Sequence, residues 1–224
     1  MTPFSVLSFD VGIKNLGACH LALSDRGAVS ISDWRVLDIG PGADGDLVKS
    51  CIVAMDAAFG GLAEAAVDLV AIENQPGLVN PKMKSVQAVI HAFFAMRRPG
   101  TPVVYVAASG KIKTARAVTG AEAPPRAKRG KAAAAVEGGA PPPKRTSYRD
   151  GKKVVIEAAE VLLRAWGLDA DLAAMRAHRK KDDLCDAFLQ GVGALGGRLV
   201  LPQPDGAGAP PALNSTVVDP CTSS

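Results

Sequence analysis

The chain has 224 residues, of which 48% are hydrophobic and 21% charged, and its formal net charge is +4. A chain of this size and composition can bury a substantial core, so one folded domain with appended segments is expected. It contains no apolar run of the ~20 residues that cross a bilayer, and its N-terminus lacks a basic region before an apolar core, so we expect a soluble, intracellular protein without a membrane segment.

Alternating and β-branched residues predict three strands in the first part of the chain, near residues 4–12, 16–24 and 29–39. Short turns separate them, so they form an antiparallel meander. The spacing of apolar residues then predicts a helix, a strand, a helix, a strand and two further helices, at 45–66, 67–73, 83–97, 102–108, 151–166 and 182–195.

This succession predicts an α/β fold with a mixed five-stranded sheet, three strands antiparallel and then two parallel, with helices on both faces. The order is similar to that of RNase H-like proteins. The first strand is then central and the fourth lies parallel beside it. We expect this domain to span residues 1–196, with a flexible basic insertion at about 121–146 and a disordered Pro/Gly-rich tail at 197–224.

The positions of the cysteines and of the charged residues indicate which kinds of site the chain can form. The four cysteines form no Cys-x-x-Cys pair and have no histidine at ligand spacing, which argues against a zinc site and a disulfide framework. Residues 111–153 contain twelve Lys and Arg but only three acidic residues, so this segment carries +9 in a chain of net +4. Such a segment favours binding to a polyanion. The alternative is a solvated basic loop without a ligand.

Four carboxylates are the strongest candidates for a functional site. Asp10 and Glu73 each end an apolar strand, and Asp183 and Asp186 stand three residues apart on a predicted helix. An isolated buried carboxylate is costly, and several converging ones repel each other unless a cation lies between them. Carboxylate oxygens suit Mg²⁺ or Mn²⁺, and two such ions together can activate a water for phosphodiester hydrolysis. Each acid alone is equally compatible with a surface or capping role.

Three segments together resemble one protein family. They are residues 8–17 (SFDVGIKNLG), residues 72–76 with 80–83 (IENQP and NPKM), and residues 180–187 (KKDDLCDA). In this order they resemble the Holliday junction resolvases of poxviruses and other large DNA viruses, which are relatives of bacterial RuvC and of the fungal mitochondrial resolvases. The resemblance covers about residues 4–195. Each motif alone is weak, because short Asp-Gly patterns recur by chance.

The resemblance implies a viral endonuclease that resolves four-way DNA junctions by paired nicks during recombination. It implies a homodimer acting on branched DNA, with no organic cofactor and with two Mg²⁺ per active site, which Mn²⁺ can replace. Asp10, Glu73, Asp183 and Asp186 would be both catalytic residues and metal ligands. A shift of one residue along the helix would make Asp182 the ligand, so Asp182 is held as an alternative or outer ligand.

Six further residues are candidates for DNA binding. Gln75 and Lys82 follow Glu73 in a loop that, by resemblance, lies near the junction centre. Lys111 and Lys113 follow the fifth strand, and Lys152 and Lys153 open the next helix, roughly where the bacterial relatives carry active-site lysines. These side chains would hold the scissile phosphate or stabilise developing negative charge. Nonspecific binding to the DNA backbone is an equal alternative for Lys111 and Lys152.

Other functions fit parts of the pattern. An actin-like sugar kinase also begins with a strand and Asp-x-Gly, but it needs a duplicated fold, and this chain shows no such repeat. A different RNase H-like nuclease, acting on flaps or RNA-containing duplexes, would use the same acids. A non-catalytic DNA-binding module is a third reading, although the presence of all four acids weighs against it.

Overall fold

The computed structural model describes residues 2–40, 45–62, 67–78, 80–121, 148–199 and 201. Nearly all of the expected insertion at 121–146, and residues 202–224 of the expected tail, lie outside this described part. At the expected start of the tail, Gly196–Arg198 form a short 3-10 helix, and Leu199 packs against the core.

Five strands form one mixed sheet in the order β3-β2-β1-β4-β5. Their bounds are β1 Phe4–Asp10, β2 Leu16–Leu23, β3 Val29–Leu37, β4 Leu69–Glu73 and β5 Val103–Val106. β1 pairs antiparallel with β2 and β2 with β3, whereas β4 is parallel to both β1 and β5. β1 is central and covered on both faces, so six of its seven residues are buried. The predicted five-stranded sheet is therefore confirmed.

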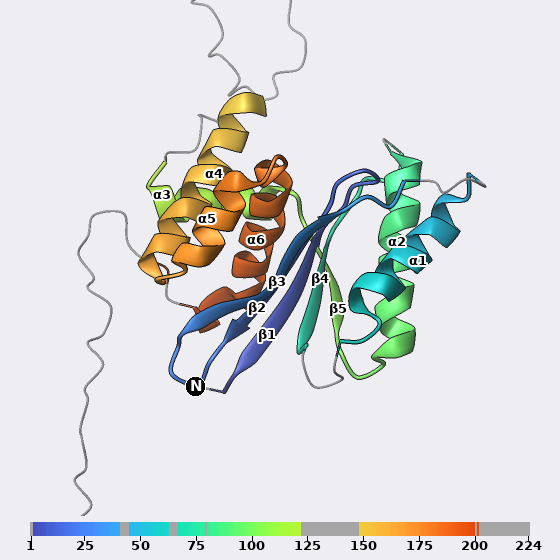
Figure 1. Cartoon of the computed structure of the whole chain (residues 1–224), viewed down its shortest axis with the longest axis horizontal. Coiled ribbons are helices and arrows are strands. Elements are labelled where there is room, and N and C mark those ends of the chain that lie inside the picture. The colour runs from blue at the N-terminus through green and yellow to red at the C-terminus, as the bar shows by residue number, and fades with distance from the viewer. Residues whose placement is uncertain are drawn as a thin grey trace, which may run out of the picture.

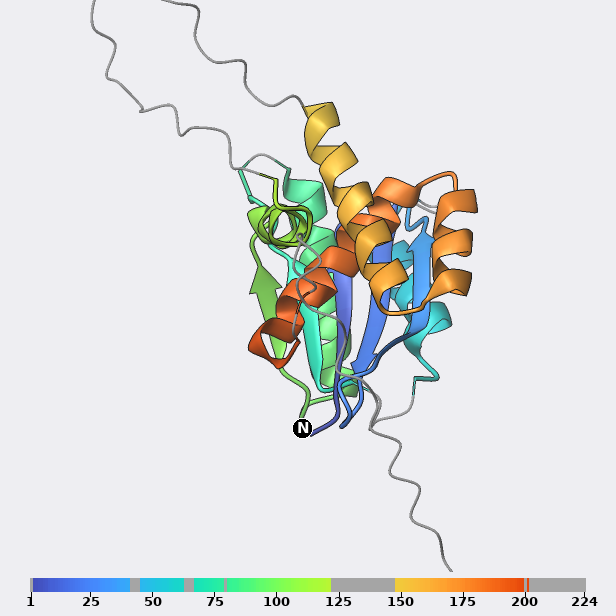
Figure 2. The same cartoon turned by 90° about the vertical axis from the view of Figure 1, so that its left-hand side faces the viewer.

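Helices cover both faces of the sheet, as predicted (Figure 1). Their bounds are α1 Leu47–Phe59, α2 Pro81–Arg97, α3 Ser109–Thr119, α4 Tyr148–Ala165, α5 Asp169–Ala177 and α6 Lys181–Leu195. α1 and α2 form one layer, and α3 to α6 form the other, with α6 directly on the sheet (Figure 2). The carboxyl ends of β1 and β4 therefore open between the two helical layers.

Each face of the sheet has its own hydrophobic core. On the α1 and α2 side, the Phe9 ring lies 5.3 Å from the Phe59 ring and 5.5 Å from the Phe94 ring. On the other side, the Trp34 ring lies 5.3 Å from the ring of Phe188, which is on α6. Burial of each such side chain contributes ~1.5–3 kcal/mol. These contacts hold one helical layer against β1, next to Asp10, and the other against β3.

Two helices were missing from the sequence-based prediction. α3 begins without a side-chain cap and buries only Ala115 and Val118, and α5 has nine residues and buries only Leu172 and Met175. Neither presents enough apolar positions for a helical period to stand out. Lys111 and Lys113 accordingly lie on a helix that the sequence analysis did not place.

Two predicted helix boundaries were also wrong. α1 ends at Phe59 and not at residue 66, because Gly60 and Gly61 follow and glycine is a poor helix former. α2 begins at Pro81, two residues earlier than predicted, where the Asn80 side chain accepts a hydrogen bond from the Met83 amide. Proline at the first helical position needs no amide donor, so Asn80 and Pro81 together form a strong helix start.

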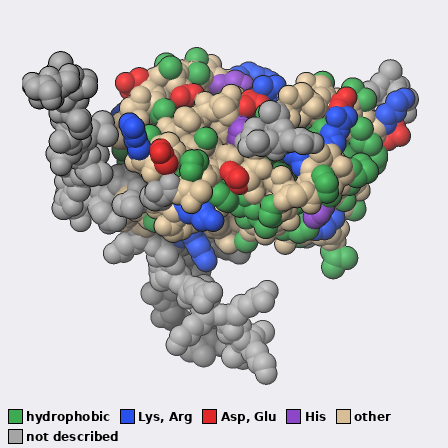
Figure 3. Space-filling model, turned by 90° about the horizontal axis from the view of Figure 1, so that it is seen from below, with side chains coloured by type: hydrophobic (Ala, Val, Ile, Leu, Met, Phe, Trp, Pro, Cys, Tyr) green, Lys and Arg blue, Asp and Glu red, His purple; other side chains and the backbone are tan. Residues whose placement is uncertain are grey.

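Some large hydrophobic side chains remain exposed on α1, α2 and the edge strand β5: Val48, Ile52, Val53, Met96, Val104 and Tyr105. Viewed from below, hydrophobic side chains gather toward the right of the molecule, on the side of α1 and α2 (Figure 3). Among the described residues, no helix is both long and apolar enough to cross a membrane.

Candidate active site

Asp10 and Glu73 are neighbours at the carboxyl ends of two parallel strands. β1 and β4 pair with Phe9 opposite Ile72, so the next residue on each strand is an acid. Both acids are buried, with exposed fractions of 8% and 7%. The prediction that the two strand ends would bring these carboxylates together agrees with the structure.

α6 brings Asp183 and Asp186 to the same place. Its N-terminal half lies very close to β2, because Gly17 has no side chain: a Cβ at this position would lie 2.5 Å from the carbonyl oxygen of Asp183. The Ser8 hydroxyl, on β1, donates to the Ala187 carbonyl at 2.7 Å and so ties the middle of α6 to the sheet. Close packing of α6 against β1 and β2 thus sets how far the helix acids lie from the strand acids.

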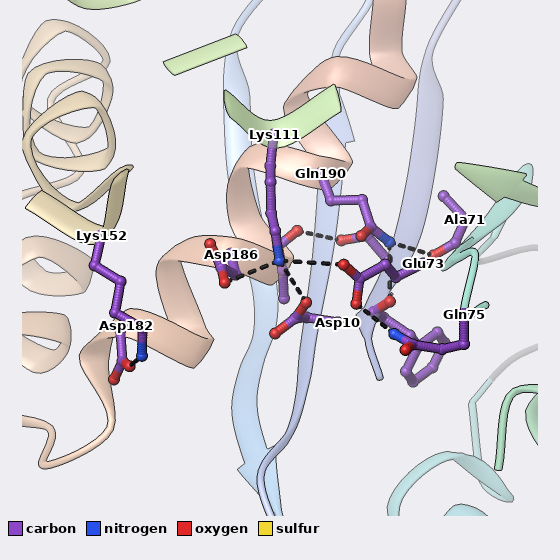
Figure 4. Close-up of polar contacts among 12 residues, drawn as sticks. Asp10, Ala71, Glu73, Gln75, Lys111, Lys152, Asp182, Asp186 and Gln190 are labelled. Carbon is purple, nitrogen blue, oxygen red and sulfur yellow. Dashed lines mark hydrogen bonds and ion pairs between the residues drawn. The ribbon is translucent and has the colours of Figure 1, made fainter. Parts of the chain in front are cut away.

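The ammonium group of Lys111 lies among three of the four acids (Figure 4). Its Nζ is 2.7 Å from Asp10 Oδ1, 2.9 Å from Asp186 Oδ2 and 3.4 Å from Glu73 Oε1. The Lys111 side chain is only 12% exposed. One positive charge therefore partly balances a cluster of buried carboxylates, and α3 supplies it.

The environment of the acids shifts their protonation. Burial, and then the nearby charge of Asp10, raise the pKa of Glu73 to about 7 and that of Asp186 to about 6, although Lys111 opposes both shifts. Burial and repulsion from Asp182 and Asp10 also raise the pKa of Asp183. Burial lowers the pKa of Lys111, but its three acidic partners outweigh burial and raise it overall. Lys111 thus does not fully offset the effect of burial and mutual repulsion on the pKa values of these acids.

Gln75 supports Glu73 from the loop after β4. Its Nε2 donates to Glu73 Oε2 at 2.7 Å, and its backbone amide donates to Gln87 Oε1 on α2 at 2.8 Å. Gln87 is almost fully buried. Gln75, predicted from sequence as a DNA contact, is thus first of all a hydrogen-bonding partner of Glu73 inside the site, and its contact with DNA stays a prediction.

The acids line an open cavity of about 620 Å³. Cationic side chains from α3 and α4 line the same cavity: Lys111 and Arg116 on α3 and Lys152 on α4. Ala121 and Asp150, which flank the undescribed part of the basic segment, also line the cavity. Carboxylates and cationic groups thus line one cavity that is open to solvent.

Asp182 and Lys152 form an ion pair beside the cavity (Figure 4). Burial raises the pKa of Asp182, but the hydrogen bond and charge of Lys152 outweigh burial and lower it overall. Asp183 and Asp186 line the cavity, whereas Asp182 does not. The arrangement therefore favours Asp183 over Asp182 as the helix acid that faces the other carboxylates.

Three of the predicted DNA-binding lysines lie outside the cavity. Lys82, Lys113 and Lys153 are exposed, and none is among the residues that line it. Lys113 lies instead over a shallow pocket between α3 and the end of α6. The structure does not bring these three side chains to the acids, and their contact with DNA stays a prediction.

Arg116 is a cavity residue that the sequence analysis missed. It lies one turn after Ile112 on the face of α3 that lines the cavity, and it makes no ion pair with any other residue in the described ranges. Arg116 was missed because the sequence analysis did not predict α3. Once this helix is known, the spacing of Ala108, Ile112 and Arg116 places them on one face.

The chemistry of the donor set fits a divalent cation. Carboxylate oxygens are the ligands of Mg²⁺ and Mn²⁺, and Asp183 Oδ2 is buried without a hydrogen-bond partner. Within the described part of the chain, however, no group of three acidic, His or Cys side chains is arranged so that it could hold a metal ion as it stands. Lys111 Nζ lies between the acids, so this side chain would have to move for a cation to bind there.

Comparisons with known proteins show which solved structures have a similar fold. No family model matches the sequence, and no curated protein matches it at a significant level. The yeast mitochondrial Holliday junction resolvase Ydc2 matches with a TM-score of 0.53 and 13% identity, over 84% of this chain and 77% of the yeast chain. RuvC of Thermus thermophilus matches over 85% of this chain and 94% of its own, with 15% identity and a TM-score of 0.49 in complex with a Holliday junction substrate. Another T. thermophilus RuvC structure matches with 18% identity and a TM-score of 0.48. The chain therefore shares its fold with the yeast protein.

Proposed function

We propose that this protein is a metal-dependent endonuclease that resolves four-way DNA junctions. The observation that carries the proposal is the convergence of Asp10, Glu73, Asp183 and Asp186 at one cavity that cationic side chains also line. The yeast protein with the same fold is a Holliday junction resolvase, which supports this substrate. The three motifs that resemble viral resolvases support the same activity and a viral origin.

The four acids would hold Mg²⁺, or Mn²⁺ in its place, with two ions per site. When bound, these ions lower the pKa of an attacking water and stabilise charge on the leaving oxygen. Among the described residues that line the cavity, none has a hydroxyl or thiol group. Hydrolysis by water therefore suits this site better than a covalent Ser, Thr or Cys intermediate.

The cationic side chains of the cavity would bind the DNA backbone. Arg116 and Lys152 line the same cavity as the acids, where they would contact phosphates beside the scissile bond. Lys111 would turn from the acids to the scissile phosphate once cations replace it. Residues 111–153 carry a large excess of positive charge, and the chain enters and leaves the undescribed part of this segment at the cavity. Such an excess gives salt-dependent affinity for DNA.

Paired nicks require two active sites, so the proposal includes a homodimer. The exposed hydrophobic side chains on α1, α2 and β5 favour an interface on that side of the molecule, away from α3 to α6. The molar mass in solution, measured by light scattering, tests this part: a dimer of the 23.0 kDa chain is expected.

Cleavage of a synthetic four-way junction tests the function, beside linear duplex, flapped duplex and an RNA–DNA hybrid of the same sequence. We expect symmetric nicks in the junction with Mg²⁺, none with EDTA, and little cutting of the other substrates. Cutting of the flap or the hybrid with the junction spared would move the activity to another RNase H-like nuclease. Binding without any cutting would leave a DNA-binding module.

A further inference from the structure

Gln190 joins three elements of the active site. It lies on α6, is only 5% exposed, and its Nε2 donates to the Phe9 carbonyl on β1 at 2.9 Å and to the Ala71 carbonyl on β4 at 3.0 Å. Phe9 immediately precedes Asp10, and Ala71 lies two residues before Glu73. A single amide group thus binds the backbones of both acid-bearing strands next to their acids (Figure 4).

The same side chain belongs to the acidic face of α6. Asp183, Asp186 and Gln190 are spaced i, i+3 and i+7, which places them on one face of a helix. Gln190 therefore connects the two helix acids with the two strand acids through one short set of covalent and hydrogen bonds. Sliding of α6 along the sheet would break both of its hydrogen bonds.

Lys111 also links Asp186 on α6 to the acids of both strands, but a bound cation would displace that ammonium group. Two other hydrogen bonds hold α6 to the sheet, and each reaches a single strand. Trp34 Nε1, from β3, donates to the Leu184 carbonyl at 2.9 Å, and the Ser8 hydroxyl, from β1, donates to the Ala187 carbonyl. Neither contact involves β4. The distance between Glu73 and the helix acids thus depends on Gln190 more than on these two contacts.

We propose that Gln190 is a positioning residue, whose amide holds α6 in the one register along β1 and β4 at which all four carboxylates face the same cavity. Ligating groups must be held within about 0.5 Å to bind and act well. A misplacement of about 1 Å can lower a rate by roughly 10²-fold. The catalytic consequence rests on the proposed nuclease function, whereas the positional one does not.

The chain offers a matched control at the other end of the same strand pair. The Ser5 hydroxyl on β1 donates to Asp68 Oδ2 just before β4 at 2.9 Å, and the Asp68 amide donates to Ser5 Oγ at 3.1 Å. Ser5 is buried like Gln190 but does not line the cavity. Ser5→Ala therefore removes a brace between the same two strands without touching the acids.

The test compares Gln190→Met, which keeps the length of the side chain and removes both donors, with Ser5→Ala. Mn²⁺ affinity is measured by calorimetry in the absence of DNA. The values of kcat and KM are measured on a four-way junction, and the melting temperature is measured in EDTA. For Gln190→Met we expect at least 10-fold weaker Mn²⁺ binding and a kcat lowered at least 30-fold, with KM within threefold. Ser5→Ala should lower the melting temperature but leave Mn²⁺ affinity and kcat within twofold.

Gln190→Asn gives a second variant, since it keeps the amide but is too short to reach both carbonyls; the same loss of Mn²⁺ affinity is expected. Unchanged Mn²⁺ affinity in a folded Gln190 variant would overturn the proposal, as would parallel losses in Gln190→Met and Ser5→Ala, or a native protein that binds no Mn²⁺. If the native protein binds Mn²⁺ but does not cut junctions, the proposed function fails, and the Mn²⁺ affinities alone decide the role of Gln190.

Discussion

Lys111 Nζ lies 2.7 Å from Asp10 Oδ1, and both side chains are nearly buried. The two residues are 101 positions apart in the sequence and belong to α3 and β1. The same ammonium contacts Asp186 and Glu73. Lys111 is thus an internal counter-ion for the acid cluster, and it occupies space that a divalent cation would share.

Removal of Lys111 should destabilise the protein in the absence of divalent cations. Lys111→Met leaves the buried Asp10 and Glu73 and the partly buried Asp186 without their cation, and breaking a buried ion pair by removing one partner costs about 3–5 kcal/mol. We expect the free energy of unfolding in EDTA, measured with urea, to fall by roughly 3 kcal/mol. Mg²⁺ should restore more stability to Lys111→Met than to the native protein.

Lys113→Met is the matched comparison for this stability measurement, because Lys113 lies on the same helix but is exposed and contacts none of the acids. Its free energy of unfolding should change by less than about 0.5 kcal/mol, as for an ordinary surface substitution. Equal stabilities for the two variants in EDTA would contradict the counter-ion role.

Stability should depend on pH through Glu73 and Asp186. Their pKa values in the folded protein are raised to about 7 and about 6, above the ordinary values of 4.5 and 3.8, so the folded state binds these protons more tightly than the unfolded state. The free energy of unfolding should therefore fall as pH rises from about 4.5 to about 7, by on the order of 2 kcal/mol.

The Glu73→Gln variant isolates the contribution of Glu73 to the pH dependence of the free energy of unfolding. In EDTA this variant should equal the native protein at about pH 3, well below both pKa values, where Glu73 is protonated in both states, and exceed it in stability at about pH 8. Urea unfolding at several pH values measures the difference. A native protein that matches Glu73→Gln at every pH would show that burial does not raise this pKa.

Asp182 and Asp183 should differ in the kind of defect they cause. Asp183 lines the cavity, so Asp183→Asn should lower cleavage by at least 100-fold and weaken Mn²⁺ binding. Asp182 is ion-paired with Lys152, so Asp182→Asn should act only by releasing that lysine, with about a 10-fold loss and native Mn²⁺ affinity. Cleavage rates and calorimetry on both variants decide the assignment, and the reverse order of defects would make Asp182 the ligand.

Arg116 should contribute one phosphate contact to DNA binding. Log affinity falls by about 0.9 per decade of salt for each phosphate neutralised on duplex DNA, so Arg116→Gln should reduce the salt slope by about that amount. Arg164→Gln is the control, because it removes the same charge from a residue that does not line the cavity. Arg164 lies near the C-terminal end of α4, where it is paired with Glu160. Its slope should match that of the native protein, and identical slopes for all three proteins would exclude Arg116 from the interface.

The sequence predicted those parts of the site that local patterns encode. A lone acid at the end of an apolar strand predicted Asp10 and Glu73, and the i, i+3 spacing predicted Asp183 and Asp186. Long-range contacts left no such pattern: a lone Gln190 in a helix, or a Lys111 beside Asp10, is recognised only when the chain is folded. α3 was missed because it lacks a cap and a wide apolar face, and Arg116 was missed with it.

Cleavage of a four-way junction by native protein, Asp10→Asn and Asp33→Asn tests the central claim most directly. Asp33 is a carboxylate on β3 that pairs with Arg35 and does not line the cavity, so it controls for loss of charge. We predict paired nicks with Mg²⁺ for the native protein and Asp33→Asn, and at least a 1,000-fold loss for Asp10→Asn with junction binding retained. Undiminished cleavage by Asp10→Asn, or cleavage that persists in EDTA, would contradict the account.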